Sequence, residues 1–95
     1  MKVTNKTSVP IKITGSNIPL TEINSQEEAT ISDGIVHNVY VVHSDIGMCQ
    51  FVIYHGHSTE AYVSRRNLQS RITVVERDSD FSGGSREMCI EVIEF

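Results

Sequence analysis

The chain has 95 residues, of which 39% are hydrophobic and 21% are charged, and its formal net charge is −4. These values are typical of one globular domain and exclude a disordered tail. The acidic balance argues against general binding to DNA or RNA, whose phosphates attract basic surfaces. No stretch of 18 apolar residues and no signal-peptide pattern occurs, so we expect a single cytoplasmic domain over residues 1–95 that does not span a membrane.

The first third of the chain predicts three short strands separated by turns. Residues 2–5 and 9–14 are strand candidates, and in the second of these Val9, Ile11 and Ile13 alternate with polar or imino residues. Pro10 cannot donate a hydrogen bond to a neighbouring strand, so this strand should begin there or lie at an edge. Residues 15–17 end it, residues 23–28 allow at most a helical turn, and residues 28–31 predict a further strand.

Residues 35–44 predict a long strand with apolar side chains on both faces. Ile35, Val39 and Val41 share one face, which we assign to the core, while Val36, Tyr40 and Val42 share the other. A strand of this kind belongs in the middle of a sandwich or barrel, or has one face covered by another subunit.

Four further strands are predicted at residues 49–55, 60–65, 71–77 and 87–95. The fold class is therefore all-β, a small antiparallel β-sandwich or barrel of about seven to eight short strands. The predicted core consists of the apolar residues on one face of each strand: Ile11, Ile13, Val39, Val41, Phe51, Ile53, Val63, Ile72, Val74, Ile90 and Val92.

Cysteine and histidine are the first candidates for chemistry. Cys49 and Cys89 lie far apart in apolar runs, which favours two buried thiols over a disulfide. His55 and His57 have a spacing that can ligate metal, but a hairpin turn between them separates the two rings. We expect no bound metal and no cofactor.

The arginines are the stronger candidates. Four of them, Arg65, Arg66, Arg71 and Arg77, fall within thirteen residues of an otherwise acidic chain. Guanidinium groups capture phosphate or carboxylate in a bidentate manner. The predicted ligand-binding residues are Arg65, Arg66 and Arg71, with Tyr54 and Tyr62 as stacking surfaces. The competing interpretation is that these arginines are solvated and paired with Glu60, Glu76 or Asp78.

The sequence predicts a non-enzymatic binding protein that acts through protein–protein contacts, as a small interaction or inhibitor module. A homo-oligomer is expected because two strands are apolar on both faces. The alternative is a protein that binds or sequesters an anionic, nucleotide-like molecule through the arginines, in the style of phage or mobile-element accessory proteins, although no residue motif carries that comparison. An enzyme is disfavoured because no nucleophile lies in a known catalytic context.

Overall fold

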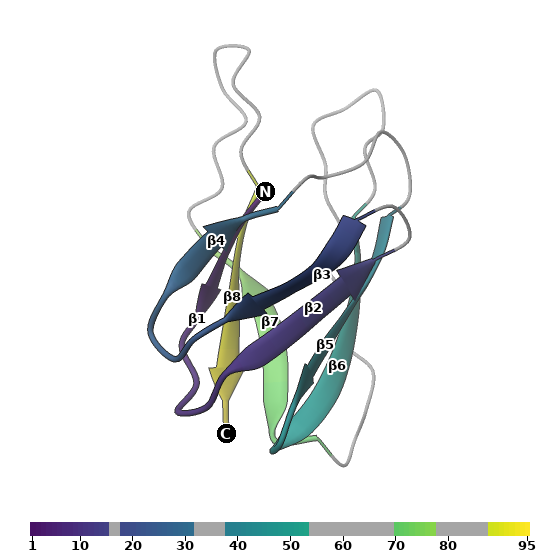
Figure 1. Cartoon of the computed structure of the whole chain (residues 1–95). Helices are drawn as coiled ribbons and strands as arrows, with labels where there is room; N and C mark the ends of the chain where they lie inside the picture. The colour runs from purple at the N-terminus through teal and green to yellow at the C-terminus, as the bar shows by residue number, and fades with distance from the viewer. Residues whose placement is uncertain (16–17, 32–37, 54–69, 78–87) are drawn as a thin grey trace.

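A computed structural model describes residues 1–15, 18–31, 38–53, 70–77 and 88–95, which form the two-layer β-sandwich of Figure 1. The strands are β1 (Lys2–Asn5), β2 (Ile11–Gly15), β3 (Ile18–Ile23), β4 (Glu28–Thr30), β5 (Asn38–Ser44), β6 (Gly47–Ile53), β7 (Ile72–Glu76) and β8 (Cys89–Glu94). The predicted all-β class with about eight short strands is therefore confirmed.

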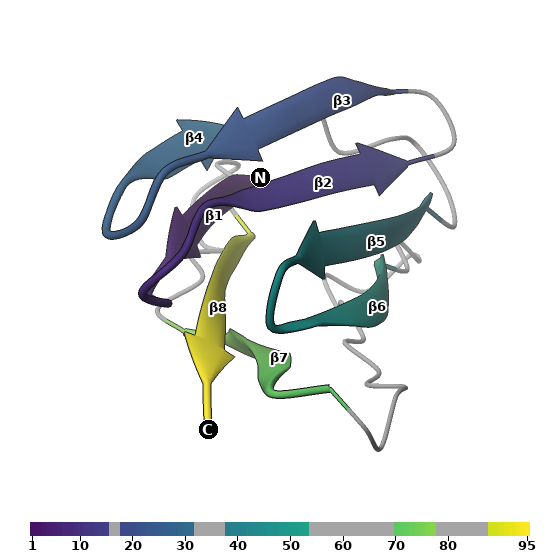
Figure 2. The same ribbon diagram turned by 60° about the horizontal axis from the view of Figure 1, so that its bottom comes forward.

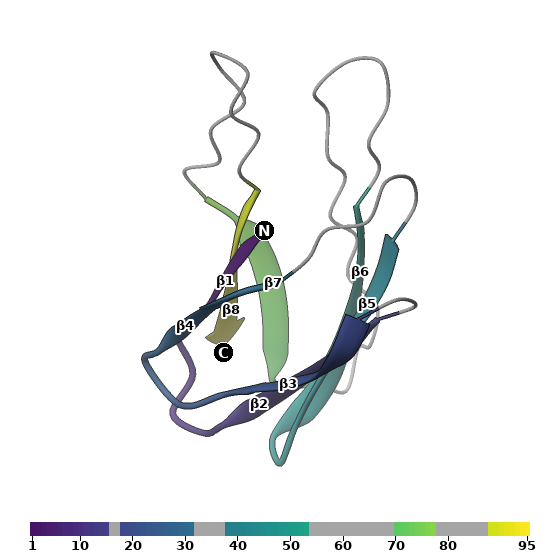
Figure 3. The same cartoon turned by 45° about the horizontal axis from the view of Figure 1, so that its top comes forward.

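Each layer is a four-stranded sheet, and Figure 3 shows the two layers facing each other. Sheet A has the strand order β4-β1-β8-β7, and sheet B has the order β3-β2-β5-β6. Neighbouring strands are antiparallel except β1 and β8, which run parallel with Val3 opposite Ile90. The first and last strands are thus paired at the centre of one sheet, as expected for ends that do not fray.

The inner faces of the two sheets form one apolar core. Seven predicted core residues are buried there: Ile11, Ile13, Phe51, Ile72, Val74, Ile90 and Val92. The prediction for Val63, the side chain of Ile53 and the strand at residues 60–65 lie outside the described part of the chain. Except in β7, where Ile72, Thr73 and Val74 are all buried, buried residues of the central strands alternate with exposed or half-buried ones, so each sheet has an inner and an outer face.

The predicted facing of β5 is wrong. Tyr40 and Val42 are buried in the core, whereas Val39 is 36% exposed and Val41 is half-buried on the outer face. Tyr40 lies opposite Phe51 of β6, and the two rings stack with centroids 4.9 Å apart. Burying the tyrosine removes more apolar area from water than burying a valine, and a stacked pair adds about 1 kcal/mol.

Strand β3 was not predicted from the sequence, because Pro19 follows the break at residues 15–17. Proline is tolerated near the start of an edge strand, and β3 is an edge of sheet B. Residues 23–28, where the sequence allows at most a helical turn, contain a tight turn in which Glu27 N donates to Asn24 O over 3.1 Å. Gln26 has φ of 66° there, a left-handed conformation that ends any helical path.

The chain crosses twice between the sheets at one corner of the sandwich. Figure 2 shows β1 continuing into β2 and β3 continuing into β4 on neighbouring paths. Strand β1 pairs with β4 in sheet A, and β2 pairs with β3 in sheet B. The four strands therefore behave as one antiparallel ribbon that bends from one layer to the other.

Asn5 holds this bend together from inside the protein. Its side chain is fully buried, and its Nδ2 donates to Val9 O at 2.8 Å and to Ile23 O at 3.0 Å. Its Oδ1 accepts hydrogen bonds from the backbone N–H of Thr7 at 2.9 Å and from the Thr7 hydroxyl at 2.6 Å. One carboxamide thus ties the β1–β2 connection to the end of β3.

The facing turn adds further hydrogen bonds to the same corner. Thr7 O accepts from Ser25 Oγ at 2.6 Å and from Gln26 Nε2 at 3.1 Å. Asn5 also uses its main chain, since its N–H donates to Glu27 O and its carbonyl accepts from Gln26 N, both at 2.8 Å. Buried polar groups that are satisfied in this way fix one backbone arrangement.

Replacing Asn5 tests this account of the corner. Asn5→Asp keeps the acceptor oxygens but removes both donors and places a carboxylate oxygen against two carbonyls. We expect the free energy of unfolding to fall by about 3 kcal/mol in urea denaturation. The matched control Asn24→Asp, at an exposed residue of the adjacent turn, should cost about 0.5 kcal/mol or less. Equal losses for the two variants would show that the buried network is dispensable.

Candidate functional site

The outer face of sheet B is the surface that differs most from the expected one. Strand register places Lys12 opposite His43 and Glu22, and His43 opposite Met48, so these side chains form one row across all four strands. The next rows pair Val41 with Thr14 and Gln50, and Val39 with Val52. The face is therefore polar in the row of Lys12, except for Met48 on the edge strand β6, and apolar towards Val39 and Val52.

Four side chains define what we name the outer apolar patch: Val39, Val41, Met48 and Val52. Val39 and Met48 are 36% and 42% exposed, and the two other valines are half-buried. Val39 and Val52 are direct cross-strand partners, and Met48 lies diagonally across from Val41. Single exposed apolar residues are normal on a surface, whereas four contiguous ones on a central and an edge strand make a candidate contact surface.

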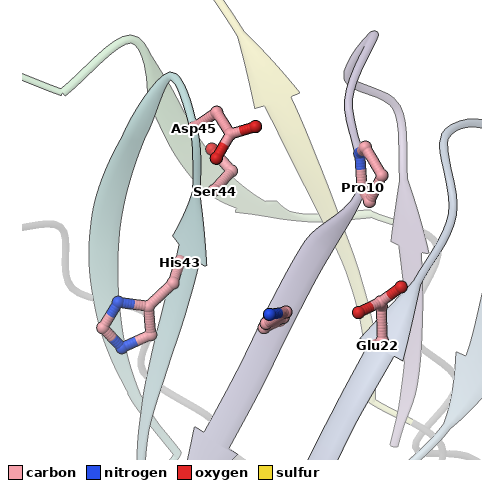
Figure 4. A pocket seen from close by; sticks show the side chains of 6 residues that line it. Pro10, Glu22, His43, Ser44 and Asp45 are labelled. Carbon is pink, nitrogen blue, oxygen red and sulfur yellow. The ribbon is translucent and has the colours of Figure 1, made fainter.

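The polar end of the same face carries a shallow hollow of about 350 Å³, lined by Pro10, Lys12, Glu22, His43, Ser44 and Asp45 (Figure 4). Lys12 lies between His43 on β5 and Glu22 on β3, and Asp45 follows at the turn after β5. Within the described residues, Lys12 forms no ion pair with Glu22 or Asp45. The polar end, defined here as Lys12, Glu22, His43 and Asp45, thus offers charges of both signs to a neighbouring molecule.

Arg71 is the one predicted ligand-binding residue that the described chain includes. It is exposed beside β7, where its backbone N–H donates to Ile46 O at 3.2 Å and its carbonyl accepts from Phe95 N at 2.8 Å. The pKa of Glu94 is lowered, first by hydrogen bonds from Ser8 and also by the Arg71 charge. Arg71 therefore lies near a carboxylate, although not one of those expected from the sequence.

The other predicted ligand-binding residues, Arg65, Arg66, Tyr54 and Tyr62, lie outside the described residues, and so do His37, His55 and His57. Arg77 pairs with Glu91 at 3.5 Å, and of the acidic partners expected from the sequence, Glu60 and Asp78 lie outside the described residues. His43 is exposed on the outer face of β5. In the described part of the chain, no group of three or more His, Cys, Asp or Glu residues is arranged to hold a metal ion.

The two cysteines are in different sheets and are not joined by a disulfide. Cys49 is buried in the core as expected, whereas Cys89 is only half-buried. Burial raises the pKa of the Cys49 thiol to about 12. Cys49 is therefore protonated at neutral pH and is core packing rather than a nucleophile.

Sequence reasoning missed the outer face because it placed Val39 and Val41 in the core and did not recognise β3. Strand β3 carries no alternation signal, because Leu20 and Glu22 share one face and Thr21 and Ile23 the other, so each face has one apolar and one polar residue. The aromatic pair on β5 and β6 is the signal that could have assigned the core face.

No family model, no curated protein and no solved structure matches this chain. Among the described residues there is no helix long and apolar enough to cross a membrane.

The raised pKa of Cys49 predicts a loss of stability in alkali. In the unfolded chain the thiol ionises near its ordinary pKa of 9.0, whereas in the folded protein it stays protonated up to about pH 12. Ionisation therefore favours the unfolded state as pH rises above about 9, by about 1 kcal/mol per pH unit. Urea denaturation between about pH 8 and 10.5 should show a steeper decline for the native protein than for Cys49→Ala. Parallel declines would contradict a buried, protonated thiol.

The arginine hypothesis remains a prediction with a direct test. If an anion binds there, a nucleotide, cyclic nucleotide or sugar phosphate at a hundred times its Kd should stabilise the protein by about 2.7 kcal/mol in a thermal shift screen. The double substitution Arg65→Ala/Arg71→Ala should abolish that shift and leave the Tm of the empty protein nearly unchanged. The control His55→Ala/His57→Ala should retain it. Binding that survives loss of the arginines would refute this site.

Proposed function

We propose that this protein is a non-enzymatic protein-interaction module and that its contact surface is the outer face of sheet B. The observation that carries the proposal is the outer apolar patch, which lies in register on β5 and β6 with Val39 36% exposed and Met48 42% exposed. Sandwich sheets ordinarily turn polar side chains to water on the outer face. Here β5 has valines where that alternation calls for polar residues.

Covering the patch with another protein would remove apolar area from water, at about 25 cal/mol per Å². Three of its four side chains are valines, which are restricted at χ1 and lose little conformational freedom when a partner binds. Val41 belongs to the central part of sheet B, flanked by β2 and β6. A contact centred there would be surrounded on several sides by further strand residues, as the apolar centre of an interface usually is.

The polar end gives such a contact its orientation. Lys12, Glu22 and Asp45 lie beside the patch on the same face, at the rim position where charges steer association and select partners. An apolar centre with a charged rim is the usual anatomy of a specific protein interface. A small-molecule site, by contrast, is normally concave and largely enclosed.

Site-specific photo-crosslinking tests the proposed surface. A photoreactive amino acid in place of Gln50, which lies opposite Val41 on the outer face of sheet B, should give a defined crosslinked protein in cells. The same amino acid in place of Thr4, half-buried on the outer face of sheet A, should not. Val41→Lys should abolish the Gln50 crosslink. No product from Gln50, or equal products from both faces, would overturn the proposal.

A further inference from the structure

We infer that Asn5 is an acceptor for N-linked glycosylation in the unfolded chain and that the fold closes this site, so that a glycan and the β-sandwich exclude each other. Asn5, Lys6 and Thr7 form the pattern Asn-x-Thr, which is the acceptor pattern for N-linked oligosaccharides. No other asparagine in the sequence is followed two positions later by serine or threonine. Acceptors of this kind normally lie in exposed loops, whereas Asn5 is 0% exposed.

The atom that would carry the sugar is already fully hydrogen-bonded in the fold. Asn5 Nδ2 has two hydrogens, and it donates one to Val9 O at 2.8 Å and the other to Ile23 O at 3.0 Å. Glycosyl transfer joins Nδ2 to the anomeric carbon of the sugar, releases one Nδ2 hydrogen as a proton and breaks the bond from that carbon to the diphosphate of a lipid-linked donor. The modified nitrogen keeps a single hydrogen, so one of the two carbonyls loses its donor.

The carboxamide has no second orientation that would free its nitrogen. Oδ1 of Asn5 accepts from the Thr7 N–H at 2.9 Å and from the Thr7 hydroxyl at 2.6 Å. A half-turn of the amide would place Nδ2 against these donors and Oδ1 against the carbonyls of Val9 and Ile23. In either orientation a sugar ring attached to Nδ2 would have to fit into a closely packed interior. The side chain can carry a glycan only if it leaves the corner.

The rest of the acceptor pattern is also held by the fold. Thr7 is buried, and its carbonyl accepts hydrogen bonds from Ser25 Oγ and Gln26 Nε2. The N–H of Lys6 donates to Val92 O at 2.8 Å, which ties the middle of the pattern to β8. A transferase therefore reaches the acceptor only in a chain whose corner has not formed. This conclusion is independent of the contact surface proposed on sheet B.

An oligosaccharyltransferase with a lipid-linked oligosaccharide donor tests whether the fold closes the site. The substrates are the native chain and the double variant Ile13→Asp/Val92→Asp, which puts an unpaired charge into the core from each sheet and keeps the acceptor pattern in an unfolded chain. Circular dichroism verifies that the native chain is folded and the variant is not. The variant should gain one glycan, seen by mass spectrometry, at least about a hundredfold faster than the native chain, because a stable domain is unfolded for only a small fraction of the time.

The control for the acceptor is Asn5→Gln in the same unfolded variant, which should abolish transfer because the pattern then has no asparagine. Equal rates on the native chain and the unfolded variant would overturn the inference. It would also be overturned if the unfolded variant received no glycan, or if transfer survived Asn5→Gln.

Semi-synthesis tests the converse, that a sugar at Asn5 prevents folding. Cys49 provides a junction at which a synthetic segment of residues 1–48 is ligated to residues 49–95, and the synthetic segment carries N-acetylglucosamine on Asn5. The matched control carries the same sugar on Asn24, whose side chain is exposed in the adjacent turn. The Asn24 glycoprotein should unfold in urea with the cooperative transition and midpoint of the unmodified chain. The Asn5 glycoprotein should show no such transition, and equal midpoints for the two glycoproteins would refute the exclusion.

Discussion

The buried carboxamide of Asn5 is the constraint on which the rest of this sandwich depends. Its Nδ2 satisfies the carbonyls of Val9 and Ile23 at the corner and so favours one position for the bend in the ribbon made by β1 to β4. An unbent ribbon would remain in one layer and leave its apolar face uncovered. The bend instead distributes the four strands over two sheets, whose inner faces then cover each other.

This division into layers determines which surfaces remain for binding. Ile11 and Ile13 of β2 point into the core, so Lys12 between them must point outward. Register then carries the same alternation across sheet B, from Glu22 on β3 to Met48 on β6. The polar end and the outer apolar patch therefore follow from the strand pairing of sheet B.

The sequence predicts the fold class well because alternation is a local signal. Neighbouring residues alone predict a strand and its buried face at Ile11 and Ile13, and again at Ile90 and Val92. Alternation cannot assign the buried face of β5, because valines occupy both of its faces. A shift of one residue in the predicted facing exchanges the buried set for the exposed set. The stacking of Tyr40 on Phe51 determines which face of β5 is buried, and that contact depends on the pairing of β5 with β6.

Neither the burial of Asn5 nor the outer apolar patch could be predicted from neighbouring residues, for a related reason. In the sequence Asn5 is one polar residue among several before a turn, and nothing nearby distinguishes a buried, four-bonded carboxamide from a solvated one. The outer apolar patch likewise unites residues of two strands whose proximity only the sheet reveals. The ambiguity of β5 has a functional side, however. Both faces of β5 are apolar, and only one of them is buried in the core. The other apolar face stays on the surface, where a partner can cover it.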